Sequence, residues 1–234
     1  MNGIIEQIRK DLSEKVDIRY KDGCVQYFTE KIDPLGVRTP EVRKISRQYW
    51  QKVKNLPKKE IIDLCKVLWS GKHEEFLIGC DWYNRINKTW DESDWQIMEW
   101  VVEKKISNWA HCDDFCNRCI GEYLINYPKY VREIYKWTNS KNRWVRRASI
   151  VSFIRPLRRN LFASDVYKIS DLLICDKDDL VQKGFGWALR DAGKIDQKKL
   201  YDWLYIRRKQ IPRISLRYAI EKMAKKDRDN LLYN

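Results

Sequence analysis

Apolar residues recur at helical spacing along almost the whole chain of 234 residues, and this periodicity restricts the protein to an all-α fold. No segment shows the apolar–polar alternation that is typical of a half-buried strand. The pattern predicts helices at about residues 2–14, 22–32, 39–54, 57–68, 73–86 and 91–105. We expect Thr39 to be the N-cap of the third helix and Pro40 its first residue, because these residue types favour those positions.

A second, longer period is superimposed on the helical one. Helical segments recur about every 30 to 38 residues, each preceded by another short helix, at residues 76–82, 114–123, 144–153, 180–189 and 214–223. This spacing is typical of helix-pair repeats of the HEAT type. We therefore predict a single domain, residues 1–234, built as an α–α superhelix whose inner helices line a concave surface.

The charge of the chain favours a polyanionic partner. Lys and Arg number 47 against 33 Asp and Glu, a formal charge of +14, so nucleic acid is the first expectation and an anionic membrane surface the second. No apolar run is long enough to span a membrane, and the N-terminal residues do not resemble a signal peptide, so we expect a cytoplasmic protein. Three pairs of arginines are four positions apart: Arg43 with Arg47, Arg143 with Arg147, and Arg213 with Arg217. Any single pair could be part of a solvated helix face. Three pairs at corresponding places favour phosphate contacts along a DNA duplex.

Seven cysteines in a chain without a secretory signal indicate reduced thiols. Cys112, Cys116 and Cys119 beside His111 could offer soft ligands to zinc or an iron–sulfur cluster. The alternative is that their spacing marks the buried stripe of a helix. We favour the second interpretation and predict neither a metal nor a cofactor.

The segment around residues 106–121 carries the strongest candidate site. Trp109 and Asp113 are four residues apart, so in a helix an indole and a carboxylate would share one face. A π face beside a negative charge suits a cationic partner. The alternatives are that Asp113 or Asp114 caps the following helix and that Trp109 belongs to the core. Trp187 follows two helical glycines, Gly184 and Gly186, which indicate close approach by a neighbouring helix or by a ligand.

Four motifs in order resemble one family: G-V-R-T-P-E-V-R at 36–43, N-W-x3-D at 108–113, W-V-R-R-A at 144–148 and Q-K-G-F-G-W-A-L-R at 182–190. Over nearly its whole length the chain resembles the AlkD-type DNA alkylation repair enzymes, which are HEAT-like-repeat alkylpurine DNA glycosylases. The resemblance implies a solenoid that wraps duplex DNA and excises cationic bases such as 3-methyladenine and 7-methylguanine without flipping them. The alternatives are a non-catalytic HEAT-like protein that binds damaged or branched DNA, and a scaffold for an acidic protein.

The resemblance also implies roles for individual residues. Asp113 corresponds to the essential carboxylate, and Trp109 and Trp187 to the aromatic residues that flank it. The residues expected to contact DNA are Arg147 beside the lesion, Tyr27 in the same cleft, and Arg38, Thr39, Arg43, Arg143, Lys183 and Arg190. The expected partner is double-stranded DNA containing alkylated bases, bound by a monomer. Ala110, Arg38 and the cysteine-rich helix depart from the family pattern and leave the range of lesions open.

Overall fold

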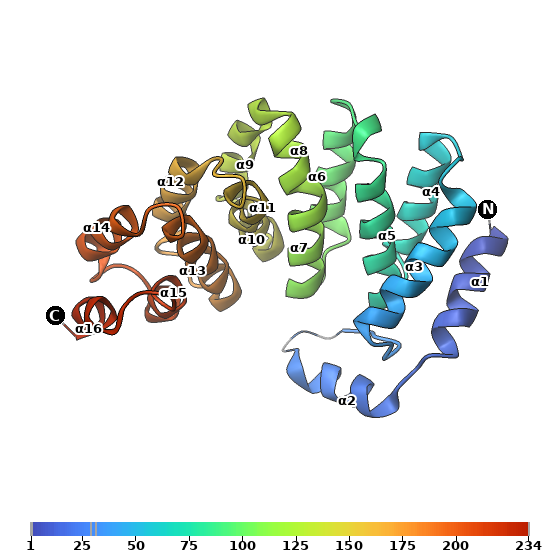
Figure 1. Cartoon of the computed structure of the whole chain (residues 1–234), viewed down its shortest axis with the longest axis horizontal. Coiled ribbons are helices and arrows are strands. Elements are labelled where there is room, and N and C mark those ends of the chain that lie inside the picture. Colours follow the sequence, from blue (N-terminus) through green and yellow to red (C-terminus); the bar gives the residue numbers. More distant parts are fainter. Residues whose placement is uncertain (1, 29, 31, 234) are drawn as a thin grey trace. The chain divides into compact units, whose positions relative to one another are not determined.

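The computed structural model describes residues 2–28, 30 and 32–233, and all regular secondary structure in these ranges is helical, as predicted. The chain divides into two compact units, one ending at Cys119 and one beginning at Ile120. Figure 1 shows the helices of both units in chain order. Among the described residues, no helix is both long and apolar enough to cross a bilayer.

The first unit is built from α1 (Asn2–Ser13), α2 (Ile18–Tyr27), α3 (Thr39–Val53), α4 (Lys58–Leu68), α5 (His73–Arg85), the 3-10 turn η1 (Asn87–Thr89), α6 (Asp94–Lys104) and α7 (Trp109–Phe115). In this unit α3, α5 and α7 pack in succession, with α1 against α3 and α4 against α5. The predicted helices agree with these bounds to within three residues, except for α2, which begins earlier and ends at Tyr27. Residues 29 and 31 of that prediction lie outside the described residues. The π-helical turn η2 (Cys116–Ile120) contains the division between the units.

The second unit continues with α8 (Gly121–Asn126), the 3-10 turn η3 (Pro128–Tyr130), α9 (Val131–Trp137), α10 (Arg143–Val151), α11 (Ile154–Leu157), α12 (Ala163–Leu173), α13 (Asp179–Gly193), α14 (Gln197–Arg207), α15 (Arg213–Ala219) and α16 (Lys225–Tyr233). Here α10, α13 and α15 pack in succession, while α9 lies against α10 and both α12 and α14 lie against α13. Within each unit, recurring segments of the sequence are therefore helices that contact their counterparts in the neighbouring pairs, α5 with α7 in the first unit and α13 with α10 and α15 in the second.

The start of α3 differs by one residue from the prediction. Thr39 is the first helical residue, and the N-cap is Arg38, whose side chain makes no capping hydrogen bond. The Arg38 guanidinium instead pairs with Asp17, with 2.8 Å between Nη2 and Oδ2. The chain before the helix is held by the buried carboxylate of Glu74 on α5, which accepts hydrogen bonds from the backbone N–H groups of residues 35, 36 and 37. Three backbone donors bound to one carboxylate fix the entry to α3 without a side-chain cap.

A neighbouring helix explains one of the two glycines of α13. A Cβ on Gly186 would lie 2.6 Å from the carbonyl oxygen of Ser215 on α15, closer than a real Cβ approaches. A Cβ on Gly184 would lie 3.4 Å from Nη1 of Arg147 on α10, an ordinary van der Waals contact, so packing does not require a glycine there. Close approach by a neighbouring helix, one of the two predicted causes, therefore accounts for Gly186.

Candidate functional site

The helix α7 presents Trp109 and Asp113 one turn apart. It begins at Trp109 because the side chain of Asn108 is the N-cap and accepts a hydrogen bond of 2.9 Å from the backbone N–H of His111. Asp113 and Asp114 both lie inside α7. The alternative in which one of these carboxylates caps the helix is therefore wrong, because the helix starts four residues before the first of them.

Trp109 and Asp113 line an open pocket of about 310 Å³ in the first unit. The pocket brings together four residues that the sequence singled out, since Thr39 and Arg43 of α3 form part of its wall. Its full lining comprises Thr39, Arg43, His73, Leu77, Trp109, Ala110, Asp113, Asp114 and Asn117. An indole, a guanidinium and two carboxylates thus share one hollow between α3, α5 and α7.

Two aromatic rings lie against Trp109. The exposed ring of Tyr27 meets the indole edge-on, with ring centroids 5.8 Å apart and an angle of 72° between the planes. Phe28, which the sequence did not single out, stacks on it with centroids 4.9 Å apart and planes at 13°. Phe28 thereby covers one face of the indole, so a ligand in the pocket would meet Trp109 at its other face or its edge.

The two carboxylates of the pocket have different surroundings. Oδ1 of Asp114 accepts a hydrogen bond of 2.8 Å from Nε of Arg118 one turn later, and Nη2 of Arg43 lies 4.0 Å from the same oxygen. Arg118 also approaches Asp81, at 3.7 Å. Asp114 is therefore tied into an ion-pair network. Asp113 lines the same pocket as Trp109.

A histidine that the sequence did not single out also lines the pocket. His73 of α5 lines the pocket, and its Nδ1 lies 3.0 Å from Nε2 of His111, which is buried behind it. These are the two histidines of the whole chain. They are 38 residues apart in sequence. Only the packing of α5 against α7 brings them together.

The cysteines near this site belong to the core. The side chains of Cys112, Cys116 and Cys119 are fully buried, with 3.9 Å between the sulfurs of Cys112 and Cys116. Burial raises the pKa of Cys119 and of its neighbour Cys80 well above the ordinary thiol value, so both thiols stay protonated. Across the described ranges, no three His, Cys, Asp or Glu side chains are grouped so that they could hold a metal ion.

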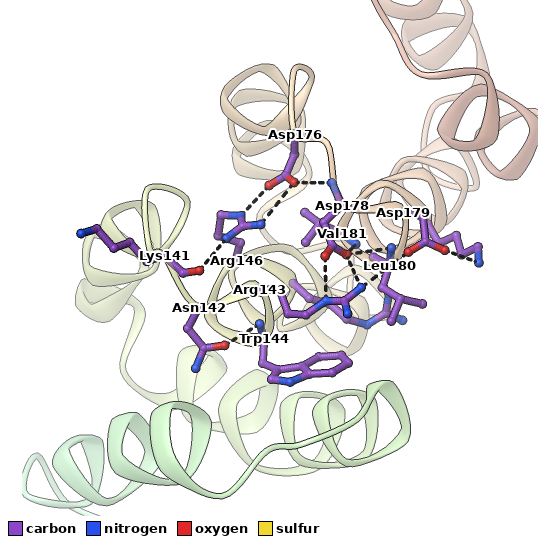
Figure 2. Close-up of polar contacts among 12 residues, drawn as sticks. Lys141, Asn142, Arg143, Trp144, Arg146, Asp176, Asp178, Asp179, Leu180 and Val181 are labelled. Atoms are coloured by element: carbon purple, nitrogen blue, oxygen red, sulfur yellow. Dashed lines mark hydrogen bonds and ion pairs between the residues drawn. The ribbon is translucent and has the colours of Figure 1, made fainter. Parts of the chain in front are cut away.

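The other predicted site residues lie in the second unit. Arg143 is held at the N-terminus of α13, with 2.7 Å between its Nε and Oδ2 of Asp178 and 3.6 Å between its Nη2 and Oδ1 of Asp179 (Figure 2). The Asp178 carboxylate also accepts the backbone N–H groups of Leu180 and Val181 as the helix N-cap. Arg143 is therefore fixed in place by α13 and is half-exposed.

Lys183 shares this acidic cluster with Arg143, since its Nζ lies 2.9 Å from Oδ2 of Asp179. That hydrogen bond, and more weakly the charge of Arg143, lowers the pKa of Asp179. Arg190 pairs with Glu221. Arg147 is 5% exposed and donates a hydrogen bond to the carbonyl oxygen of Leu180.

Trp187 of α13 is half-buried. Within the described part of the chain its indole makes no hydrogen bond and contacts no other aromatic ring. Trp187 and Arg147 thus belong to the second unit, and Trp109 and Asp113 to the first. Their joint role stays a prediction.

Comparison with known proteins identifies both a family and a fold. The family model described as "DNA alkylation repair enzyme" matches residues 8–223. A structure described as a predicted DNA alkylation repair enzyme from Enterococcus faecalis has a TM-score of 0.79 at 15% identity, covering 90% of this chain and 98% of that one. AlkD2 from Streptococcus mutans has a TM-score of 0.59 at 19% identity, covering 79% of this chain and 90% of its own.

A third solved structure, smu.31 from Streptococcus mutans UA159, has a TM-score of 0.55 at 18% identity and covers 79% of this chain and 97% of that one. At these identities the likeness establishes the helical-repeat fold alone. No curated protein matches the chain.

Proposed function

Because the chain belongs to the DNA alkylation repair enzyme family, we propose that it is a DNA glycosylase that hydrolyses the N-glycosidic bond of cationic alkylpurines in duplex DNA. The observation that carries the proposal is the pocket in which Trp109 and Asp113 lie together with Arg43. The family match supports a role in DNA repair. The reaction class rests on the chemistry of these side chains.

One carboxylate suffices for this reaction. Hydrolysis of a glycosidic bond passes through an oxocarbenium-like transition state, and most sugar hydrolases need a second carboxyl group to protonate the leaving group. An N-alkylated purine is already cationic and leaves as a neutral base without an acid. Asp113 would stabilise the positive charge that develops on the sugar and accept a proton from the attacking water.

The indole of Trp109 favours a cationic nucleotide over a neutral one. A cation over the face of an indole gains about 0.5 to 2 kcal/mol, depending on how far it is desolvated. Trp187 of α13, which is half-buried, would supply the second such surface. Undamaged bases are neutral and gain less from either ring, so the aromatic residues contribute to selection of the lesion.

Basic residues of both units would bind the phosphates of the damaged duplex. Arg43 and Thr39 line the pocket. Arg143 lies on α10, and Lys183 and Arg190 lie on α13. Arg147 is proposed to act beside the lesion. We further propose that the protein acts as a monomer in the cytoplasm.

The reaction is proposed to proceed without base flipping. A pocket of about 310 Å³ that is open to solvent is not an enclosed base-binding cavity. The expected consequence is that bulky cationic purine adducts are excised as well as methylated ones. Base release from methylated DNA with no release of bulky adducts would contradict this part of the proposal.

The test compares the parent protein with Asp113→Asn on methylated duplex DNA, with free 7-methylguanine and 3-methyladenine measured by chromatography. Release by the parent and loss in the variant are expected. The matched control is Asp63→Asn on α4, which makes the same charge change at an ion pair with Lys66 outside the pocket and should release base at the parental rate.

The test also separates the proposed enzyme from the main alternative. DNA binding measured in parallel should be retained by every variant. A parent that binds DNA but releases no base would favour a non-catalytic protein for damaged or branched DNA. An Asp113→Asn protein with the parental rate would overturn the assignment of this carboxylate.

A further inference from the structure

The two histidines form an imidazole pair at the pocket, which His73 lines and behind which His111 is buried. Their rings are nearly parallel, at 9°, with centroids 5.0 Å apart, while the bonded nitrogens are only 3.0 Å apart. The two nitrogens are therefore much closer than the ring centres and lie within the distance of an N–H···N hydrogen bond. Phe76 stacks on His111 at 3.9 Å and fixes the orientation of the inner ring.

Burial determines which nitrogen carries each proton. Nδ1 of His111 is buried and has no hydrogen-bond partner. A buried donor without a partner is rarer and costlier than an unsatisfied acceptor, so this nitrogen is left unprotonated. The proton of His111 then lies on Nε2 and is donated to Nδ1 of His73.

The tautomer of His73 follows from that of His111. Because Nδ1 of His73 accepts the hydrogen bond, its own proton lies on Nε2, on the far side of the ring from His111. This nitrogen makes no hydrogen bond to the described residues and is not buried. His73 lines the same pocket as Asp113, so the pair presents one N–H donor of fixed direction to that pocket.

Both imidazoles are neutral at physiological pH. Burial lowers the pKa of His73, against the opposing charges of Glu74 and Asp114, and lowers the pKa of His111 well below the ordinary value. Charged and titratable groups face His73 from every element packed around it. Arg43 lies on α3, Glu74 on α5, and His111, Asp113 and Asp114 on α7. Lys72 and Asp33 precede α5 and form an ion pair, and the carbonyl oxygen of Asp33 accepts the backbone N–H of His73.

We propose that His73 is a second catalytic residue, which holds the attacking water together with Asp113, and that His111 is a positioning residue that fixes the tautomer of His73. The water accepts a hydrogen bond from Nε2–H of His73 and donates one to the Asp113 carboxylate. One of its lone pairs remains directed at the sugar. This inference rests on the proposed glycosylase function.

The step balances without any further reactant. The bond between C1′ and the purine nitrogen breaks, and its electron pair neutralises the positive charge of the departing base. The water oxygen forms the new bond to C1′ and gives its proton to Asp113, from which the proton passes to solvent. His73 stays neutral throughout and only orients the water.

The first test reads the tautomers directly and needs no activity. Because the chain contains two histidines, protein labelled with ¹⁵N-histidine gives the imidazole signals of these residues alone in a long-range ¹H–¹⁵N spectrum. Assignment comes from His111→Phe. We expect both rings to be neutral at pH 7 and protonated on Nε2. A proton on Nδ1 of His73, or an imidazolium at either position, would overturn the proposal.

The second test measures single-turnover base release. His73→Phe keeps an aromatic ring beside Phe28 but removes the donor, and the rate should fall roughly 100-fold with DNA affinity unchanged. His73→Gln restores an N–H near the position of Nε2 and should recover part of the loss. Tyr135→Phe, which removes a ring hydroxyl bonded to Asp165 in the second unit, is the control and should leave the rate unchanged.

The third test uses pH to separate a positioning role from a structural one. Protonating His73 in the parent forces His111 to place a proton on its buried Nδ1. His111→Phe removes this penalty, so His73 should take up its second proton at a higher pH than in the parent, as the histidine ¹⁵N shifts in a pH titration report. A midpoint for His73 identical to the parent's would contradict the role of His111.

The outcomes for the two proposals are distinct. Loss of base release in Asp113→Asn with the parental rate in His73→Phe would overturn this inference and leave the glycosylase standing. Absence of base release by the parent would overturn the proposed function itself, and with it the role of His73 in a water attack.

Discussion

At the scale of single residues, buried polar side chains determine the geometry of the first unit. Glu74 is 1% exposed and lies next to His73 at the start of α5. Its carboxylate binds three consecutive backbone N–H groups at distances of 2.8 to 3.0 Å. Gly36, the middle of these residues, has a φ of 99°, which disfavours any side chain there. Glu74 thus holds the strained turn that leads into Thr39 and Arg43.

Replacing this carboxylate should weaken the fold. Glu74→Gln turns an amide N–H toward a backbone N–H, which leaves a buried donor unsatisfied, so the free energy of unfolding should fall by about 1 to 3 kcal/mol. Urea denaturation measures the change. Glu14→Gln, at an exposed position after α1, should change it by less than about 0.5 kcal/mol. Equal stability of the two variants would contradict the role of Glu74.

The histidine pair should make stability depend on pH. Both folded pKa values are lowered, so the unfolded chain binds more protons than the folded one below the ordinary histidine pKa of about 6.5. The free energy of unfolding should therefore decline as pH falls through about 6.5, and this contribution is fully present above it. His111→Phe should show a shallower decline between about pH 7 and 5 in thermal melts, because one titrating group is gone. An unchanged slope would count against buried neutral imidazoles.

At the scale of elements, helix contacts and helix starts place the functional side chains. The helix α13 carries Trp187 and packs directly on α15 through Gly186. The hydroxyl of Ser215 donates a hydrogen bond of 2.9 Å to the carbonyl oxygen of Gln182 across this contact. The orientation of Trp187 therefore depends on how α13 packs against α15 through Gly186.

A methyl group at this contact should separate the two helices. Gly186→Ala places a Cβ 2.6 Å from the Ser215 carbonyl oxygen and 2.8 Å from Cβ of Tyr218, so it should lower the free energy of unfolding by about 1 to 3 kcal/mol. Gly23→Ala in α2 is the matched control, since nothing lies within 4 Å of its new Cβ. The control should stabilise by up to about 1 kcal/mol because Ala favours a helix. Both are read from chemical denaturation.

The N-cap of α7 should influence activity as well as stability. Asn108→Ala removes the acceptor for the backbone N–H of His111 and should cost about 0.5 to 2 kcal/mol. Because Trp109 is the first residue of the helix, base release should fall more than in Asp196→Ala, which removes the cap of α14. Equal base release by the two variants would indicate that the cap has no influence on the pocket.

At the scale of the whole molecule, the net charge of +14 governs the encounter with DNA. Several ion pairs reduce the number of cations available to phosphates, among them those of Arg143 with Asp178 and of Lys183 with Asp179 at the start of α13. Arg43 is half-exposed and its nearest carboxylate contact is at 4.0 Å. It is therefore the predicted phosphate ligand least committed to an ion pair in the first unit.

The affinity for duplex DNA should fall with salt, with a negative slope of log affinity against log salt. Arg43→Gln should reduce the magnitude of that slope by about 1, as expected for the loss of one phosphate contact. Arg132→Gln, an 80% exposed arginine on α9, is the control. Fluorescence anisotropy across a salt series measures both slopes. Identical slopes for the two variants would remove Arg43 from the DNA-binding surface.

Local sequence determined where the helices form, that they are arranged as helix-pair repeats, and that Trp109 and Asp113 lie one turn apart. Apolar spacing reflects which face of each helix is buried, so it predicted an all-helical repeat protein, and positions i and i+4 placed Trp109 and Asp113 on one face. Motifs identified the family because each is one short continuous stretch of the chain, at the start of a helix or within it.

Only tertiary packing decided the contacts between distant segments. The sequence could not show whether a helix or a ligand approaches Gly186, because either would leave no room for a Cβ. In the structure α15 lies there. Nor did the sequence reveal that Glu74 would hold the entry to α3, or that His73 and His111 would share a proton across 38 residues. Hydrogen bonds of this kind form between residues whose separation in the chain is set by how whole helices pack, and no local pattern records that packing.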